Sequence, residues 1–401
     1  MKSAIKDPKK KNKKMSVFYL RSMRKKWIHV CAICGEEKPI SRIIGVCKDC
    51  LKSHFNEAID YIVNAHKIAR KPYGLPLHPP KSADGFKCTL CANECILGPG
   101  DVGFCGLRWN ENGKLVSLST AKRGVLYAYW DPHVTNCCAA WFCPAGTGLG
   151  YPEYAVRPGP EYGYYNYAIF FYGCNFDCLF CQNFSHKRIS EGLIVSAQDL
   201  ARRILDNHKC TCICYFGGSP EPQLPYSINV NRIILEEKPE NRILRICYEW
   251  NGAGNPTLVR KVAEQVLVSG GIIKFDLKAF SPEIYYALTG VKARDQVFKN
   301  FEMIYHEFYN DRKEIPILTA TTLLVPGYVD ANEVEQIAKF IAELDPNIPY
   351  SLLIFHPDFM MTDLPVTPKK QVWDCYQAAK KYLKRVHVGN IFLLDVAPAT
   401  I

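Results

Sequence analysis

The stretch YAIFFYGCNFDCLFCQN, residues 167–183, joins an apolar, β-like run to a loop that contains three cysteines. Cys174, Cys178 and Cys181 follow the order C-x3-C-x2-C, without a fourth cysteine in the loop. Three thiolates on one loop can hold three corners of a cubane iron–sulfur cluster. A missing fourth thiolate leaves one iron open to a ligand, as an open position distinguishes catalytic from structural zinc sites. The stretch therefore predicts a catalytic cluster with a binding position for a cofactor.

From this stretch onward, β-rich runs alternate with helical runs. Further β-rich runs occupy residues 210–216, 243–250, 271–280, 315–325 and 350–356. Six strand-then-helix units predict parallel strands joined by right-handed crossovers. The expected fold class is therefore α/β, a partial (β/α)6 TIM-like barrel over residues 166–401. Its site is expected at the carboxyl ends of the strands.

The positive charge of the chain is concentrated at its beginning. The formal net charge is +11, and residues 1–30 hold eleven Lys/Arg against one Asp. The rest of the chain is therefore near neutral, which argues against a nucleic-acid-binding body. We expect residues 1–30 to be a solvated, disordered tail, with an RNA-binding or docking arm as the alternative.

Nineteen cysteines are the main feature of the composition. No apolar run approaches the ~20 residues of a membrane helix, and no apolar signal-peptide core follows the basic start. We therefore expect a cytoplasmic protein without membrane contact. In such a protein, clustered cysteines indicate metal binding or redox chemistry rather than disulfides.

The first cysteine module is expected over residues 31–71. It contains two C-x2-C pairs separated by twelve residues and followed by a helical pattern. Each pair can present two sulfurs to one tetrahedral ion. This spacing predicts a zinc-ribbon-like knuckle, or one iron in the same cage, with the ligands Cys31, Cys34, Cys47 and Cys50.

A Pro/Gly-rich linker and a second cysteine module are expected over residues 72–165. Four thiolates here suit one metal centre, either zinc or an iron–sulfur cluster, and the predicted ligands are Cys88, Cys91, Cys95 and Cys105. Three later cysteines fit another centre, completion of the previous one, or small buried hydrophobes: Cys137, Cys138 and Cys143.

Cys210, Cys212 and Cys214 alternate along the second predicted strand. A period of two places all three on one face of that strand. We interpret them as apolar filling of the core, with an extra cluster or radical quenching as the alternative.

The three-cysteine loop, with Phe180 before its last cysteine, resembles the radical S-adenosylmethionine (SAM) superfamily. The resemblance implies a 4Fe-4S cluster whose free iron binds SAM, and Phe180 beside the cofactor. It also implies reductive cleavage of SAM to a 5′-deoxyadenosyl radical. The resemblance therefore implies an oxidoreductase that is sensitive to oxygen and works under anaerobic conditions.

Residues 166–401 are most similar to the pyruvate formate-lyase activating enzyme branch. The resemblance implies that Gly217, Gly218 and Ser219 contact SAM, although Ser219 stands where an acidic residue is usual and Glu221 lies two positions on. It implies further cofactor-binding positions at later strand ends, namely Glu249, Asn251, Asp276, Lys278 and His356. Asp276 and Lys278 are expected to face one cavity.

The branch implies an enzyme that activates or modifies a protein and takes electrons from a low-potential donor such as ferredoxin or flavodoxin. Activating enzymes with an extra ferredoxin-like domain carry an eight-cysteine insert at this point, and no such insert follows Cys181 here. This difference weakens the inference that the substrate is a glycyl-radical enzyme. A radical SAM methyltransferase, cobalamin-dependent or not, is the first alternative, although DPHVTN (131–136) lacks the glycine of the usual cobalamin motif. A zinc-ribbon nucleic-acid-binding protein is the less favoured one.

Overall fold

The computed structural model describes residues 27–312 and 315–396. The predicted basic tail lies outside the described residues as far as residue 26. Its last residues belong to the knuckle, because Ile28–Val30 form strand β1, which pairs antiparallel with β2 (Glu37–Pro39). No described helix is both long and apolar enough to cross a membrane.

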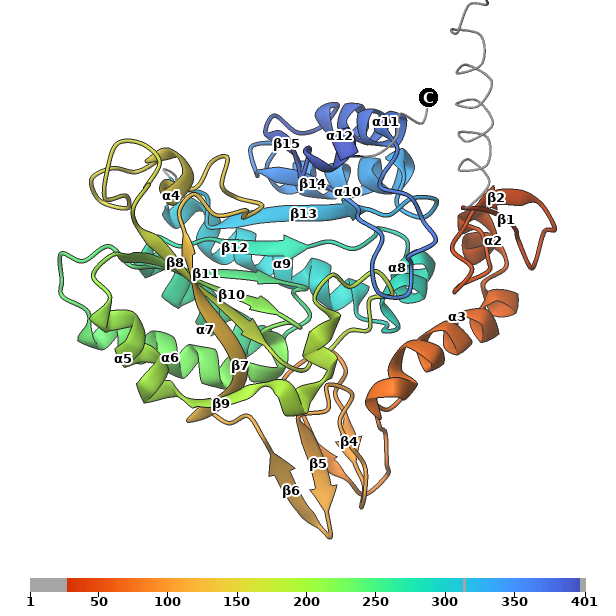
Figure 1. The fold of residues 1–401 in the computed structure, drawn as a ribbon, viewed down its shortest axis with the longest axis horizontal. Coiled ribbons are helices and arrows are strands. Elements are labelled where there is room, and N and C mark those ends of the chain that lie inside the picture. The colour runs from red at the N-terminus through yellow and green to blue at the C-terminus, as the bar shows by residue number, and fades with distance from the viewer. Residues whose placement is uncertain (1–26, 313–314, 397–401) are drawn as a thin grey trace, which may run out of the picture.

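A nine-stranded sheet organises the molecule (Figure 1). Its order is β15-β14-β13-β12-β11-β10-β8-β7-β9. The seven neighbouring strands from β15 to β8 in this order are parallel. The parallel strands are β8 (Tyr165–Phe171), β10 (Cys210–Gly217), β11 (Arg245–Trp250), β12 (Ile273–Asp276), β13 (Leu318–Leu324), β14 (Tyr350–Ile354) and β15 (Val386–Gly389). The predicted α/β class with parallel strands is confirmed, and all six predicted strands are present.

Three strands of this sheet were not predicted. They are β15 and two antiparallel additions, β7 (Arg123–Pro132) and β9 (Leu193–Ser196). Since β9 and β15 are the two edges, the sheet is open in the described part of the chain. The partial-barrel form stays a prediction.

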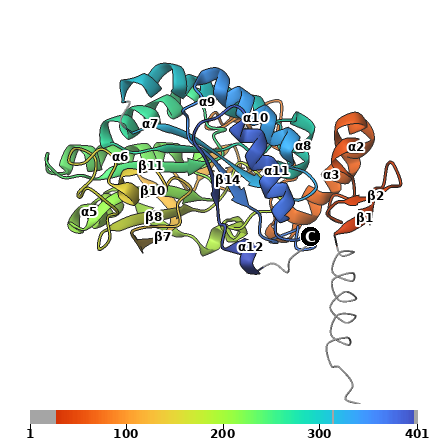
Figure 2. The same ribbon diagram turned by 90° about the horizontal axis from the view of Figure 1, so that it is seen from above.

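Most crossover helices lie on one side of the sheet, as Figure 2 shows for α7, α9 and α10. The parallel strands follow one another in sequence order, so right-handed crossovers all return over the same face. The helices are α5 (Ala197–Asp206), α6 (Leu224–Glu237), α7 (Pro256–Ser269), α8 (Pro282–Thr289), α9 (Arg294–Phe308), α10 (Ala331–Leu344), α11 (Lys369–Lys380) and α12 (Leu393–Val396). We call the helix-covered face the outer face and the opposite one the inner face.

The two faces have different side chains. Ile213, Tyr215 and Ile246 belong to the main apolar core under the helices. Cys212, Cys214 and Cys247 lie in a separate buried cluster. Because neighbouring strand residues point to opposite faces, the inner face receives the cysteines and also the polar residues in phase with them, such as Glu249, Lys274 and Asp276.

The prediction that Cys210 shares a face with Cys212 and Cys214 is wrong. The pairing of β10 with β8 shifts between Cys210 and Cys212, which marks an irregularity in the strand. An inserted residue reverses the alternation, so Cys210 packs in the outer core while Cys212 and Cys214 lie on the inner face.

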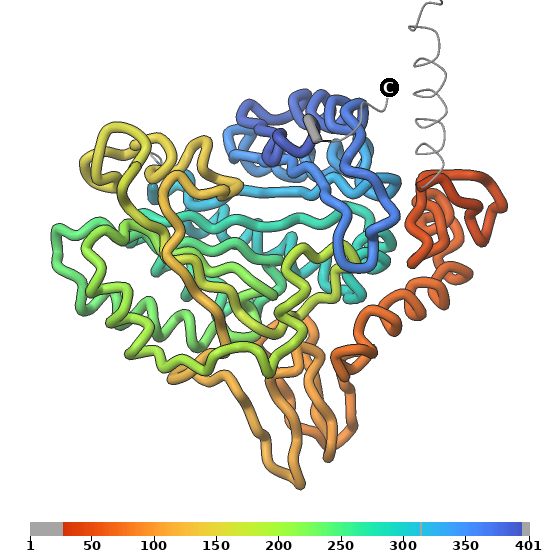
Figure 3. Tube along the Cα trace, viewed as in Figure 1, coloured from red at the N-terminus to blue at the C-terminus, as the bar shows by residue number. Residues whose placement is uncertain are grey.

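The N-terminal part lies along one end and one edge of the sheet, shown in red and orange in Figure 1. Its helices are α2 (Lys48–Ser53) and α3 (Phe55–Arg70), and the latter is the helix expected after the knuckle. The short strands that follow are β3 (Phe86–Lys87), β4 (Ile96–Leu97), β5 (Arg108–Glu111) and β6 (Lys114–Ser117). The long connection between β7 and β8, residues 133–164, contains α4 (Pro144–Thr147) and appears yellow in Figure 3. We call it the β7–β8 connection.

Candidate active site

A cavity of about 190 Å³ lies at the carboxyl ends of the parallel strands. All three cysteines of the 174–181 loop line it, together with most of the predicted cofactor-binding residues. Those residues are Phe180, Gly217, Gly218, Ser219, Glu249, Asn251, Asp276 and Lys278. His356 follows β14, is exposed and is not among the lining residues. The structure thus brings together every predicted residue of this site except His356.

The cysteine loop is fixed by a buried carboxylate that sequence reasoning missed. Asp177 is fully buried and contacts Lys187, the His66 Nδ1 atom at 2.7 Å and the Arg70 guanidinium at 3.6 Å. Burial alone raises the pKa of Asp177, but these groups outweigh it and hold that pKa at about 2. Because His66 and Arg70 belong to α3, the N-terminal helix positions the loop.

Two glycines form the edge of the cavity beside the cysteine loop. Gly217 has a φ of +110°, and a Cβ at Gly218 would overlap the carbonyl oxygen of Gly173. The Cys174 thiol donates to the Gly218 carbonyl at 3.0 Å. Only glycine allows the 217–218 backbone to approach the cysteine loop this closely. Without side chains, this backbone is accessible from the cavity.

Ser219 and Glu221 have structural partners. The Ser219 hydroxyl accepts from the Asn251 backbone N–H at 3.3 Å. Glu221 is fully buried, accepts from the Gly252 backbone N–H at 2.6 Å and is not among the lining residues. Burial raises the pKa of Glu221 to about 7. Glu221 therefore does not take the place of the acidic residue that Ser219 replaces in the cavity wall.

Charged groups at the ends of β11 and β12 face the cavity. Lys278 contacts the Asp276 carboxylate, and its ammonium lies 5.4 Å from the centre of the Phe180 ring. Among the described residues, three carboxylate oxygens are buried without a hydrogen-bond partner: Asp276 Oδ1 and Glu249 Oε2 of the cavity lining, and Glu221 Oε2 outside that lining. Unpaired buried carboxylate oxygens are costly, so the two atoms of the lining suit a polar ligand or a cation in the cavity.

Asn251 connects the cavity wall to the loop, since its Nδ2 donates to Asn175 Oδ1 at 2.8 Å. Burial raises the pKa of Cys178 to about 12, against the effect of the nearby Lys278 ammonium. A thiol in this environment becomes a thiolate when a bound metal supplies positive charge. The loop is therefore suited to hold metal rather than to act as a free nucleophile.

The two upstream cysteine sets differ in spacing. The ligand atoms of Cys31, Cys34, Cys47 and Cys50 all lie within 4.8 Å of one another. A tetrahedral ion with bonds of about 2.3 Å places its sulfurs ~3.8 Å apart, so this set fits a single ion. The knuckle is closed by its own four sulfurs.

The second set surrounds a small enclosed cavity, which all four of its cysteines line: Cys88, Cys91, Cys95 and Cys105. No three of them lie within 4.8 Å of one another in the described chain. This wider spacing favours a cluster over one ion. The Asn93 side chain also donates to the Asn175 carbonyl at 2.7 Å, so this module adjoins the catalytic loop.

Comparison with known proteins agrees with a cysteine loop that holds a metal cluster beside a cofactor cavity. Residues 168–341 match the model of the radical SAM superfamily. An uncharacterized protein of Methanocaldococcus jannaschii is 23% identical over 321 residues, 76% of this chain and 81% of that protein. Residues 168–341 of this chain therefore carry a radical SAM domain.

Two further relatives from the same organism are each named "Putative glycyl-radical enzyme activating enzyme". One is 23% identical over 236 residues, 56% of this chain and 88% of that protein. The other is 28% identical over 188 residues, 45% of this chain and 64% of that protein. The resemblance to the activating-enzyme-like branch is thereby confirmed.

Proposed function

We propose that this chain is a radical SAM enzyme that activates or modifies a protein. The carrying observation is the single cavity in which the three cysteines meet the glycine edge and the acidic strand ends. Cys174, Cys178 and Cys181 would hold a 4Fe-4S cluster, and SAM would lie between the open iron and the strand ends. The bound pair supplies reductive cleavage of SAM to a 5′-deoxyadenosyl radical.

The residues of this chain have distinct proposed tasks. Gly217 and Gly218 offer backbone carbonyls at the wall nearest the cysteine loop. The unpaired oxygens of Glu249 and Asp276 suit the cationic amino group and the ribose hydroxyls of SAM. Asn251 and the Asp177 anchor keep the loop aligned with the strands.

A protein substrate is supported by the names of the relatives, and a low-potential donor such as ferredoxin or flavodoxin follows from the cluster chemistry. The domain division at about residues 31, 72 and 166 is part of the same proposal. So is zinc in the knuckle, which fits its single-ion spacing. We place the protein in the cytoplasm of cells with anaerobic chemistry.

Little favours the alternatives. His133 of the DPHVTN stretch is 6% exposed and its Nε2 lies 3.1 Å from the Thr211 hydroxyl, so it is engaged inside the fold rather than offered to cobalamin. The nucleic-acid alternative depends on the knuckle and on the basic tail, and residues 1–26 of that tail lie outside the described residues.

The test uses anaerobically reconstituted protein. We expect 5′-deoxyadenosine from SAM after dithionite reduction, and none without reductant. Cys178→Ala should abolish the product, whereas Cys375→Ala should not, because Cys375 is buried in α11 away from the cavity. Product formation by Cys178→Ala, or none by wild-type protein with its cluster assembled, would contradict the proposal.

A further inference from the structure

We propose that the inner face of the sheet holds an iron–sulfur cluster of its own, directly beneath the catalytic cavity. Its ligands come from six residues that we call the inner-face cysteines: Cys137, Cys138, Cys143, Cys212, Cys214 and Cys247. None of these residues lines the catalytic cavity, and none belongs to the two upstream sets. The inference therefore stands independently of the proposed function.

Three of these cysteines are positioned by the strands. Cys214 of β10 and Cys247 of β11 are register partners, and the Cys212 and Cys247 sulfurs are 3.7 Å apart. Glu249, two residues beyond Cys247 on the same face, lines the catalytic cavity. Two strand residues span ~7 Å, so the strand cysteines lie one layer of side chains below that cavity.

The β7–β8 connection brings the other three cysteines to the same place. Cys137 and Cys143 pack against the buried cluster that contains Cys212, Cys214 and Cys247. The ligand atoms of Cys137, Cys138 and Glu249 lie within 4.8 Å of one another. Backbone N–H groups donate to sulfur at 3.4 Å in Cys137 and 3.3 Å in Cys143. Such bonds stabilise and tune cluster thiolates.

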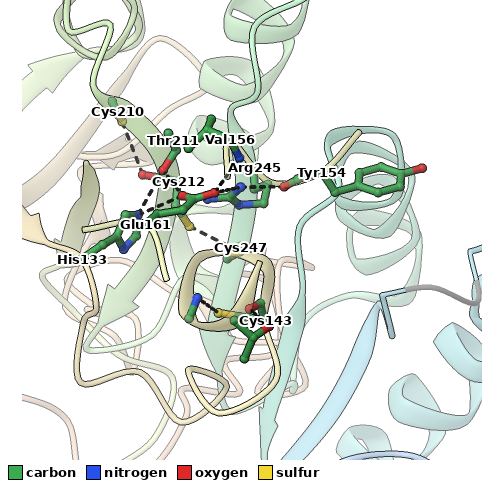
Figure 4. Close-up of polar contacts among 12 residues, drawn as sticks. His133, Cys143, Tyr154, Val156, Glu161, Cys210, Thr211, Cys212, Arg245 and Cys247 are labelled. Carbon is green, nitrogen blue, oxygen red and sulfur yellow. Dashed lines mark hydrogen bonds and ion pairs between the residues drawn. The ribbon is translucent and has the colours of Figure 1, made fainter. Parts of the chain in front are cut away.

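A buried ion pair fastens this connection to the strands (Figure 4). Glu161 is fully buried and accepts from Arg245 Nη1 and Nη2 at 2.9 and 2.5 Å, and from the Thr211 hydroxyl at 2.6 Å. Arg245 also donates to the Tyr154 carbonyl at 2.6 Å. The loop cysteines are thus held against the strand cysteines by a rigid network.

The charges around the cysteines favour an anionic centre that contains metal. Lys274 is 2% exposed, and its ammonium donates to the Cys214 sulfur at 3.1 Å. Its register partner is Glu249, yet among the described residues Oε2 of that carboxylate has no hydrogen-bond partner. A buried ammonium directed at neutral thiols lacks compensation. A thiolate-ligated cluster supplies the negative charge that Lys274 lacks.

A cluster fits this site better than one ion. A single tetrahedral ion takes four ligands with sulfurs ~3.8 Å apart. The site offers six cysteines, and their close contacts fall into two separate groups, one on the strands and one on the connection. A multi-iron core can join the two groups, because its ligands bind different metal atoms.

The test measures iron, acid-labile sulfide and zinc per chain in full-length protein purified anaerobically. The parent variant is Cys174→Ala/Cys178→Ala/Cys181→Ala, which removes the catalytic ligands. Cys143→Ala/Cys247→Ala is added to it, and Cys210→Ala/Cys375→Ala is the matched control in buried cysteines outside the site. Iron held by the second upstream set contributes equally to both.

We expect the site pair to lose about two to four irons with their sulfide, as for a [2Fe–2S] or [4Fe–4S] cluster, and the control pair to lose none. Equal iron in the two, or loss of zinc without iron, would overturn the proposal. Because the variants could misfold, cysteine alkylation of the wild-type protein provides a second readout that does not depend on them. Cys137 and Cys143, which are half-buried, should be alkylated only after iron chelation, whereas Cys210 and Cys375 should stay unlabelled. Equal alkylation before and after chelation would also overturn it.

Discussion

The N-terminal knuckle and the 174–181 loop both gather cysteines, and we propose opposite purposes for them. The knuckle gathers four sulfurs within 4.8 Å of one another, so an ion there has no open position. The loop contributes three cysteines, spreads them along a cavity and surrounds them with glycine backbone and unpaired carboxylate oxygens. Under the proposed function, ligand spacing and the neighbouring cavity distinguish a structural from a catalytic cysteine site.

The strongest test of this comparison removes a knuckle ligand. Structural zinc contributes an apparent binding free energy of about 10–16 kcal/mol, so Cys47→Ala should lose the one zinc per chain that we propose for the knuckle and should unfold the β1–α2 region. Metal analysis and hydrogen exchange measure both effects. SAM cleavage should stay within about threefold of wild type, because Cys47 does not line the cavity. Loss of the loop's iron together with the zinc would show that the two sites are not separate.

The loop, in contrast, depends on buried charge from the rest of the chain. Asp177→Asn leaves Lys187 and Arg70 buried without their carboxylate, which should cost about 3–5 kcal/mol of unfolding free energy. Denaturant unfolding of the apo protein measures this loss. The exposed Asp295→Asn is the control and should change stability by less than ~0.5 kcal/mol. Equal effects would mean that Asp177 is not an anchor.

The glycine edge should matter for cofactor affinity. The Cβ of Gly218→Ala would displace the backbone next to the cysteine loop, so we expect the Kd for SAM to rise about 10- to 100-fold, or ~1.4–2.7 kcal/mol. Equilibrium binding to the reconstituted protein measures it. Gly159→Ala, where a Cβ would meet no atom within 4 Å, should bind SAM like wild type. An unchanged Kd for Gly218→Ala would remove this edge from the binding site.

The smallest effect is expected at His356. Its side chain is exposed and outside the lining of the cavity, so His356→Ala should change the Kd for SAM by less than about twofold. A tenfold rise in the same binding assay would return His356 to the site.

Local patterns in the sequence predicted much of this architecture. The six strands were visible as β-rich runs between helical segments, and the C-x3-C-x2-C spacing located the site. Strand β7 lacks a helical partner in the βα pattern, and β9 and β15 are only four residues each, so periodicity did not identify them. The irregularity after Cys210 reversed a face assignment that strict alternation had made.

Other features exist only because distant segments meet. The Asp177 anchor joins α3 to the loop, and the inner-face cysteines come from the β7–β8 connection and two strands. Cys214 is interpreted from its spacing along one strand as apolar filling of the core. Contacts of this kind are set by the tertiary fold, which the spacing along one segment does not report.

The most direct test of the central claim is electron paramagnetic resonance of the dithionite-reduced protein with and without SAM, in a Cys143→Ala/Cys247→Ala background that removes the proposed inner-face cluster. If SAM binds the open iron of the 174–181 loop, its addition should shift the g values of the reduced cluster, and Cys181→Ala should lack the shifting signal. A reduced-cluster spectrum unchanged by saturating SAM would contradict the account.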